Sequence, residues 1–253
     1  MVINPNALGM EIPPGSMRVQ PSLWYADEPA RPGTWADLLP ARAGAGMQPV
    51  LLVNDEKRSV AWDQTLDADQ APDDPDDHDP VETLRHLWDW VQAEDGDEDD
   101  ADTIAPFTTA WPGLAPPGEL RDDPDAVAAR LAAELVEDGR LPGARAGLVP
   151  ARRSADVLTS LGWLGACNHT DTAPLSSILR SWEDRFGIRV VALHFDRLDL
   201  SVAAPPRTMD EALAVAAEHH AFCPDNVWQE YETIREYAAE ALLGKQHWTF
   251  WWD

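Results

Sequence analysis

The residue types most suited to metal binding form two short pairs. His219 and Cys223 are four residues apart on a predicted helix, so they share one face of it. Cys167 and His169 form a second pair. Two thiolates and two imidazoles are a ligand set that zinc accepts in tetrahedral geometry. The spacing matches no usual zinc pattern, because Cys-x-His is tight for two ligands of one ion and Cys-x-x-Cys is absent. No cofactor is predicted, and zinc on these four residues is kept as the alternative.

A second group of polar residues has the types needed for general acid–base catalysis. His194 and Asp196 follow the most apolar predicted strand, a position where α/β folds often place ligand sites. Glu218, His219 and Asp225 lie on or after a later helix. These five residues are the catalytic candidates, with Asp199 close by in the sequence. The structural alternative is that Asp225 stabilises a helix N-terminus and that Asp196 and Asp199 belong to a turn.

Motifs for nucleophilic catalysis and nucleotide binding are absent from the sequence. There is no Gly-x-Ser-x-Gly, no Walker-type loop and no Gly-x-Gly-x-x-Gly. Nucleotide hydrolysis and dinucleotide binding are therefore not expected. Whether the protein is an enzyme is left open, with a non-enzymatic role favoured.

The charge of the chain is concentrated in one segment. The net charge is −26 over 253 residues, and residues 63–102 hold 17 acidic residues against one basic residue, Arg85, a net −16. So acidic a protein is not expected to bind nucleic acid, whereas it attracts a basic protein. Inside the segment, Leu84, Leu87 and Trp88 lie at helical spacing next to Asp95, Asp97 and Asp99. We predict that these six residues bind a basic partner, against the alternative of a solvated acidic loop.

The composition indicates a protein with a substantial core in a reducing compartment. The chain is 44% hydrophobic and has two cysteines, so a disulfide framework is not expected. No apolar run is long enough to span a membrane, and the first 20 residues do not resemble a secretory signal. A cytoplasmic location without membrane association follows as the expectation, and the oligomeric state is not determined.

Hydrophobic periodicity predicts an α/β fold, with α+β as the alternative, in which a mixed sheet is covered by helices. Residues 1–140 form a Pro/Asp-rich region with one element near Leu23–Tyr25, a strand pair at Pro49–Val53 and Ser59–Trp62, and helices at Val81–Gln92 and Asp125–Glu137. Residues 144–253 form a separate α/β domain. Its expected elements are strands at Arg145–Pro150, Ile188–Phe195, Asp199–Ala203 and His247–Trp252, and helices at Ser154–Ser160, Ala173–Phe186, Thr208–Phe222 and Asp225–Leu243.

Several stretches of this second region resemble a known family. They are Gly147–Ala151, Leu161–Gly165 with Asn168, Leu179–Gly187, Leu200–Pro206, Ala217–Asn226 and Trp248–Asp253. Together and in this order they resemble the domain of unknown function family 4253, over about residues 144–253. The resemblance implies a bacterial cytoplasmic protein, common in actinomycetes. It implies no activity and no catalytic residue.

Two functions follow as expectations. The first is an acidic interaction module that binds a basic protein, in the manner of immunity proteins or nucleic-acid mimics. The second is a small-molecule-binding or hydrolytic domain that uses the His/Asp/Glu residues of the C-terminal region.

Overall fold

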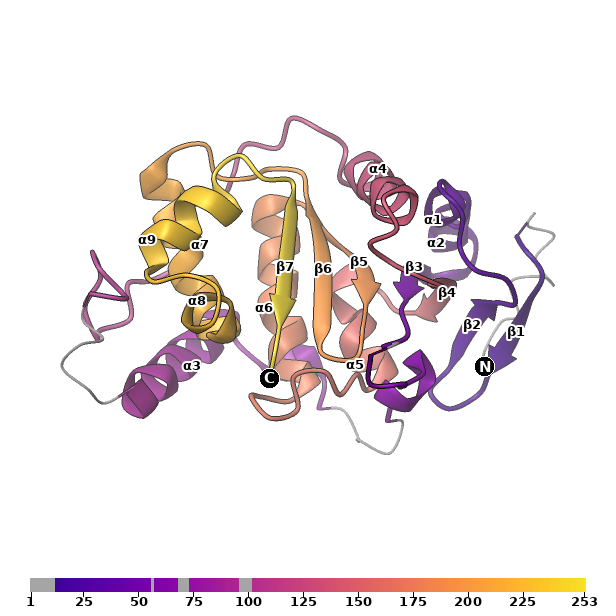
Figure 1. Ribbon diagram of the computed structural model, residues 1–253, viewed down its shortest axis with the longest axis horizontal. Helices are drawn as coiled ribbons and strands as arrows, with labels where there is room; N and C mark the ends of the chain where they lie inside the picture. The colour runs from indigo at the N-terminus through magenta and orange to yellow at the C-terminus, as the bar shows by residue number, and fades with distance from the viewer. Residues whose placement is uncertain (1–11, 56, 68–72, 96–101) are drawn as a thin grey trace.

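A single seven-stranded sheet forms the centre of the computed structural model, which describes residues 12–55, 57–67, 73–95 and 102–253 (Figure 1). The strand order is β1-β2-β4-β3-β5-β6-β7. β3 and β5 are parallel, and the other neighbouring pairs among these strands are antiparallel. The strands are β1 (Gly15–Arg18), β2 (Leu23–Ala26), β3 (Met47–Leu52), β4 (Arg145–Pro150), β5 (Ile188–Leu193), β6 (Arg197–Val202) and β7 (His247–Trp251). The predicted mixed sheet covered by helices is confirmed.

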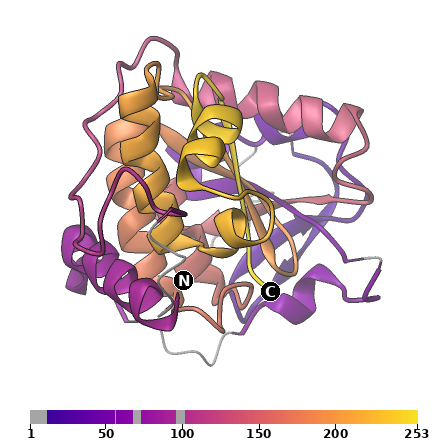
Figure 2. The same cartoon turned by 60° about the vertical axis from the view of Figure 1, so that its left-hand side comes forward.

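Helices cover both faces of the sheet and surround two hydrophobic clusters. They are α1 (Thr34–Asp37), α2 (Pro40–Ala45), α3 (Pro80–Asp95), α4 (Pro124–Glu137), α5 (Val157–Leu161), α6 (Thr172–Phe186), α7 (Met209–Phe222), α8 (Asp225–Trp228) and α9 (Ile234–Tyr237). The larger cluster joins α5, α6 and α7 to one face, and the smaller joins α1 and α4 to the other. α3 packs at the periphery against α6 and α7 (Figure 2). Short helical turns are η2 (Trp62–Thr65), η3 (Pro75–Asp77), η5 (Ser154–Asp156) and the π-helical η6 (Ala238–Leu242).

The N-terminal region contributes three strands to this sheet. β4 lies between β2 and β3, and Gly147 faces Tyr25 on one side and Val50 on the other. A Cβ at Gly147 would lie 3.1 Å from the Leu52 side chain and 3.2 Å from the Leu23 side chain, so glycine lets these side chains approach. Residues 12–45 contain β1, β2, α1 and α2, whereas the sequence predicts one element in this stretch, near Leu23–Tyr25. The proposed division near residues 140–144 stays a prediction, while strands from both sides of it share one sheet.

Capping side chains explain where some of the helices begin. Thr208 caps α7 in a capping box, in which its hydroxyl accepts from the Glu211 N–H and the Glu211 carboxylate accepts from the Thr208 N–H. The predicted single helix over Asp225–Leu243 is wrong. α8 ends at Trp228, and Thr233 caps a new helix, α9, by accepting a hydrogen bond from the Glu236 N–H. The cap at Thr233 and the non-helical residues before it therefore divide a stretch that apolar periodicity predicts as one helix.

Among the residues that the structure describes, no helix has the length and apolar character needed to cross a membrane.

Candidate functional site

Several polar side chains gather around Asp199 on β6. Leu198 and Leu200 enter the hydrophobic core, and Asp199 between them points to the opposite face of the sheet. Its Oδ2 atom lies 2.8 Å from His194 Nε2, and its Oδ1 atom lies 2.8 Å from His247 Nε2. Thr249 donates to Oδ1 at 3.1 Å, and Arg197 donates to Oδ2 at 3.1 Å. These five residues are called the Asp199 cluster below.

The Asp199 carboxylate is fully buried, yet it is held in its charged form. Burial alone would raise its pKa, but hydrogen bonds from His194 and His247 and the charge of Arg197 outweigh burial and keep the pKa well below its ordinary range. An ionised carboxylate only accepts hydrogen bonds, so His247 carries a proton on the Nε2 atom that faces Asp199. In a neutral imidazole the lone pair is then on Nδ1. Asp199 therefore orients both histidines and fixes the tautomer of His247, while Arg197 Nη2 also contacts His194 Nε2 at 2.9 Å.

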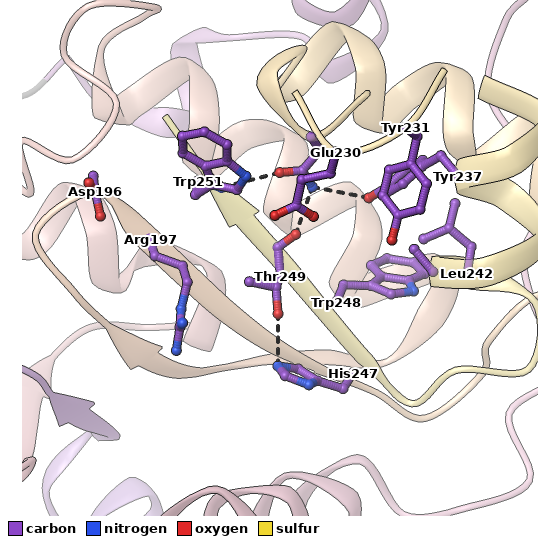
Figure 3. A pocket seen from close by; sticks show the side chains of 12 residues that line it. Asp196, Arg197, Glu230, Tyr231, Tyr237, Leu242, His247, Trp248, Thr249 and Trp251 are labelled. Atoms are coloured by element: carbon purple, nitrogen blue, oxygen red, sulfur yellow. Dashed lines mark hydrogen bonds between the residues drawn. The ribbon is translucent and has the colours of Figure 1, made fainter. Parts of the chain in front are cut away.

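A pocket of about 510 Å³ borders this cluster at the free edge of β7. Arg197, His247 and Thr249 belong to both the cluster and the pocket wall, whereas Asp199 lies behind them. Figure 3 shows Arg197 and His247 on one side of the pocket and Tyr231 with Leu242 on the other. The remaining lining residues are Asp196, Asn226, Glu230, Tyr237, Ala241, Trp248 and Trp251. We call this cavity the β7-edge pocket.

Asn226 closes part of the free edge of β7 within this pocket. Its amide nitrogen donates to the Thr249 carbonyl at 2.7 Å, and its amide oxygen accepts from the Trp251 N–H at 3.3 Å. A single side-chain amide thus makes the two bonds that a neighbouring strand would make. It also donates to the Tyr237 hydroxyl at 3.2 Å, which links β7 to α9. The wall of the pocket is therefore held by hydrogen bonds.

The structure brings together some of the predicted catalytic residues and separates others. His194 belongs to the Asp199 cluster, and Asp196 lines the β7-edge pocket, where it pairs with Arg58 at 2.8 Å. Asp225 lies at the start of α8 and accepts a hydrogen bond from the Asp253 N–H. Glu218 and His219 are on α7, inside the core and outside the lining of the pocket. The five candidates therefore do not form one site.

Glu218 has a complete set of partners that ties a loop to two helices. Arg185 donates to both of its carboxylate oxygens, at 2.7 and 2.6 Å. Trp182 donates to one of them at 2.7 Å, and the Ala115 N–H donates to the other at 2.6 Å. A fully buried carboxylate with four donors is typical of a structural ion pair. Its position supports packing of the segment around Ala115 against α6 and α7 rather than proton transfer.

The metal-ligand candidates are also dispersed. Cys167 is exposed, and His169 lies 3.1 Å from the Ala221 carbonyl. His219 is buried, with Nδ1 at 2.9 Å from the Tyr237 hydroxyl, and burial lowers its pKa well below the usual value. Cys223 donates to the Trp251 carbonyl, and burial raises the pKa of its thiol. The described residues contain no group of three or more His, Cys, Asp or Glu side chains arranged to hold a metal ion.

The predicted docking face on α3 needs correction. Leu84, Leu87 and Trp88 are buried in the larger hydrophobic cluster, where α3 packs against α6 and α7. Their helical spacing reflects burial in the core of this chain, so these side chains are not free to receive a partner. Asp95 is the last residue of α3, while Asp97 and Asp99 lie outside the described residues.

His247, Arg197 and Asn226 were not predicted as site residues. The alternation of Trp248, Phe250 and Trp252 into the core already implied that His247 and Thr249 face the other way. The register that pairs Asp199 with Thr249 was not available from the sequence, so the contact between Asp199 and His247 could not be predicted.

Fold and site together describe an α/β protein with a polar cluster beside a pocket at a sheet edge. Residues 145–253 match the family model described as Domain of unknown function (DUF4253), which confirms the resemblance seen in the motifs. This part of the chain is similar to that family. It contains β4 to β7 and every residue of the Asp199 cluster. No curated protein and no solved structure was found to match the chain.

Proposed function

We propose that the C-terminal region binds a small molecule in the β7-edge pocket and that His247 acts on it as a general base. The observation that carries the proposal is the contact of 2.8 Å between Asp199 and His247 at the wall of a pocket of about 510 Å³. Pockets of this size are typical of sites for small molecules. A buried carboxylate that orients an imidazole is a recurring arrangement in acid–base catalysis.

In this proposal each cluster residue has a separate task. Asp199 accepts a hydrogen bond from the Nε2–H of His247, which leaves the Nδ1 lone pair to take a proton from a bound hydroxyl group or a water molecule. The deprotonated oxygen then bonds to an electrophilic carbon of the substrate, the bond from that carbon to the leaving group breaks, and His247 gives its Nδ1 proton to the departing group. Arg197, whose side chain is 31% exposed and pairs with Asp199, can donate a further hydrogen bond to an anion that develops in the pocket. This chemistry corresponds to the hydrolytic function that the sequence predicts as the alternative.

The interaction-module hypothesis keeps its charge argument and loses its docking face. The net charge of residues 63–102 still favours a basic partner. Because Leu84, Leu87 and Trp88 are buried, that hypothesis no longer has a named apolar anchor. Small-molecule binding is therefore the better-supported proposal.

Binding is tested by filling the pocket. Ala241 lines it, and Ala241→Phe should block ligands without touching the Asp199 cluster. Ala239→Phe is the matched control, because Ala239 is an exposed neighbour in η6 that does not line the pocket. A library of small polar metabolites is screened by thermal shift and by tryptophan fluorescence. We expect at least one compound to stabilise the wild type and Ala239→Phe by several degrees but not Ala241→Phe.

The general-base role is tested on any compound found in this way. His247→Gln keeps a donor for Asp199 but cannot accept a proton, so binding should persist while turnover falls at least 100-fold, on the order expected for general-base catalysis. His86→Gln, at an exposed histidine of α3, is the control. If no compound distinguishes Ala241→Phe from Ala239→Phe, binding in the pocket is wrong. If His247→Gln turns substrate over at the wild-type rate, the general-base role is wrong.

A further inference from the structure

The two ends of the β7-edge pocket differ in charge. Arg197 lines one end, and its guanidinium is already in contact with the Asp199 carboxylate at 3.1 Å. Asp196 pairs with Arg58 at 2.8 Å. Glu230, an exposed residue, also lines the pocket, and among the described residues no cationic group pairs with its carboxylate. Glu230 is therefore the pocket charge that the chain itself leaves uncompensated.

Aromatic side chains surround the end of the pocket that holds Glu230. Tyr231, Tyr237 and Trp248 line this end, and Trp251 lies on the other side of Glu230 (Figure 3). The rings of Tyr231 and Tyr237 are 5.2 Å apart and meet edge to face. Aromatic faces attract cations through their quadrupole, and the attraction grows when the cation is partly removed from water. A carboxylate beside several aromatic rings is a suitable environment for an organic cation.

The charges near Tyr231 are negative and therefore also favour a cation. Burial raises the pKa of the Tyr231 hydroxyl, and the negative charges of Glu230, Glu240 and Glu236 raise it further. These three carboxylates make the potential near Tyr231 negative. The net charge of −26 on the whole chain adds a long-range attraction for cations.

We infer that the β7-edge pocket selects small molecules that carry an ammonium or guanidinium group, with that group held by Glu230 and the surrounding aromatic rings. The inference rests on the proposed function and specifies its ligand class. The cationic group binds at the Glu230 end, so the remainder of the molecule extends toward His247 and Arg197. A cationic substrate would thus present its uncharged portion to the general base.

Three probes of similar size and different charge test this inference. They are butylammonium, butanol and butyrate, titrated against the full chain while tryptophan fluorescence and saturation-transfer NMR are recorded. We expect butylammonium to bind, butanol to bind more weakly and butyrate not to bind. Raising the salt concentration should weaken butylammonium binding and leave butanol unaffected.

Two glutamate substitutions locate the cation. Glu230→Gln removes the pocket carboxylate and should weaken butylammonium binding about tenfold, the effect of one lost charge-assisted contact. Glu232→Gln is the matched control, because it makes the same change in net charge at an exposed residue outside the pocket lining. Equal effects of the two substitutions would show that only the overall charge matters and would overturn the inference.

The outcomes separate this inference from the proposed function. If butyrate or butanol binds as tightly as butylammonium, and Ala241→Phe abolishes this binding, the cation preference is wrong while binding in the pocket stands. Butylammonium binding that is unchanged in Ala241→Phe places the cation elsewhere and overturns the inference. Failure of every compound to distinguish Ala241→Phe from Ala239→Phe would remove the proposed function as well.

Discussion

Asp199 is the single residue on which the polar contacts of the sheet edge converge. Asp199→Asn keeps the size of the side chain but removes the charge that His194, His247 and Arg197 contact. We expect the free energy of unfolding at pH 7 to fall by about 3 kcal/mol, since breaking a buried ionic network leaves charged partners uncompensated. Urea denaturation measures this loss, and Asp89→Asn on the exposed face of α3 serves as the control. A loss no larger than that of the control would contradict the assigned role.

The lowered pKa of Asp199 also predicts a pH dependence. Its folded pKa lies below the unfolded value of about 3.9, so the folded state binds the proton less readily than the unfolded chain. The stability contributed by its ionised form is present above about pH 5 and is lost as the pH falls through and below 3.9. Stability should therefore decrease less steeply between pH 5 and pH 3 in Asp199→Asn than in the wild type. Parallel slopes in urea titrations at these pH values would contradict the prediction.

His220 on α7 gives a second pH dependence at a higher range. Both of its ring nitrogens lack partners among the described residues, its ring meets Trp88 and Trp228 edge-on, and burial lowers its pKa to about 4. The unfolded value is about 6.5, so stability present above pH 6.5 is lost as the pH falls toward 4. His220→Phe should remove about 2 kcal/mol of the stability loss between pH 7 and pH 5. Chemical denaturation at pH 7 and at pH 5 measures this loss of stability, with the exposed His86→Gln as the control. A loss in His220→Phe equal to that of the wild type would contradict burial of a neutral imidazole.

At the scale of elements, β7 depends on one side chain for its outer hydrogen bonds. Asn226→Ala leaves the Thr249 carbonyl and the Trp251 N–H without the amide that pairs with them. We expect a loss of about 2–4 kcal/mol, since each unsatisfied buried group costs roughly 1–3 kcal/mol. Amide exchange of Trp251, followed by NMR, should become faster, while exchange in β4 should change only in proportion to global stability. Unchanged protection of Trp251 would show that the edge of β7 is held by other contacts.

Elements with strong local patterns could be predicted from the sequence. β4, β5, α6 and α7 have apolar runs or amphipathic spacing, and glycine or a capping residue marks their ends. β2 could not be predicted as part of the same sheet, because its partner β4 lies more than 100 residues away. The same difference between local and long-range signals applies to the site residues. His194 and Asp196 were found from their position after a strand, whereas His247 required the register between β6 and β7.

At the scale of the whole molecule, the sheet joins the two parts of the sequence. The family match begins at residue 145, yet β3 lies between β4 and β5 and pairs with both. β3 is buried along its whole length. β3 pairs in parallel with β5 and antiparallel with β4. It therefore links β4 to the β5–β7 part of the sheet. The pocket therefore depends on a scaffold that includes residues from outside the matched region.

This arrangement predicts that residues 145–253 expressed alone do not reach the native fold. Removing β3 takes away the buried side chains of Met47, Val50, Leu51 and Leu52, each worth about 1.5–3 kcal/mol on burial. Their sum of roughly 6–12 kcal/mol is comparable to the stability of a typical domain. The loss would also leave β4 and β5 without a shared neighbour and expose their edges to aggregation. Circular dichroism and amide NMR of the fragment, beside the full chain, should show poor chemical-shift dispersion and no cooperative thermal transition. A dispersed spectrum with a sharp transition would mean that residues 145–253 form an independent domain, in which β4 and β5 reach a stable arrangement without β3.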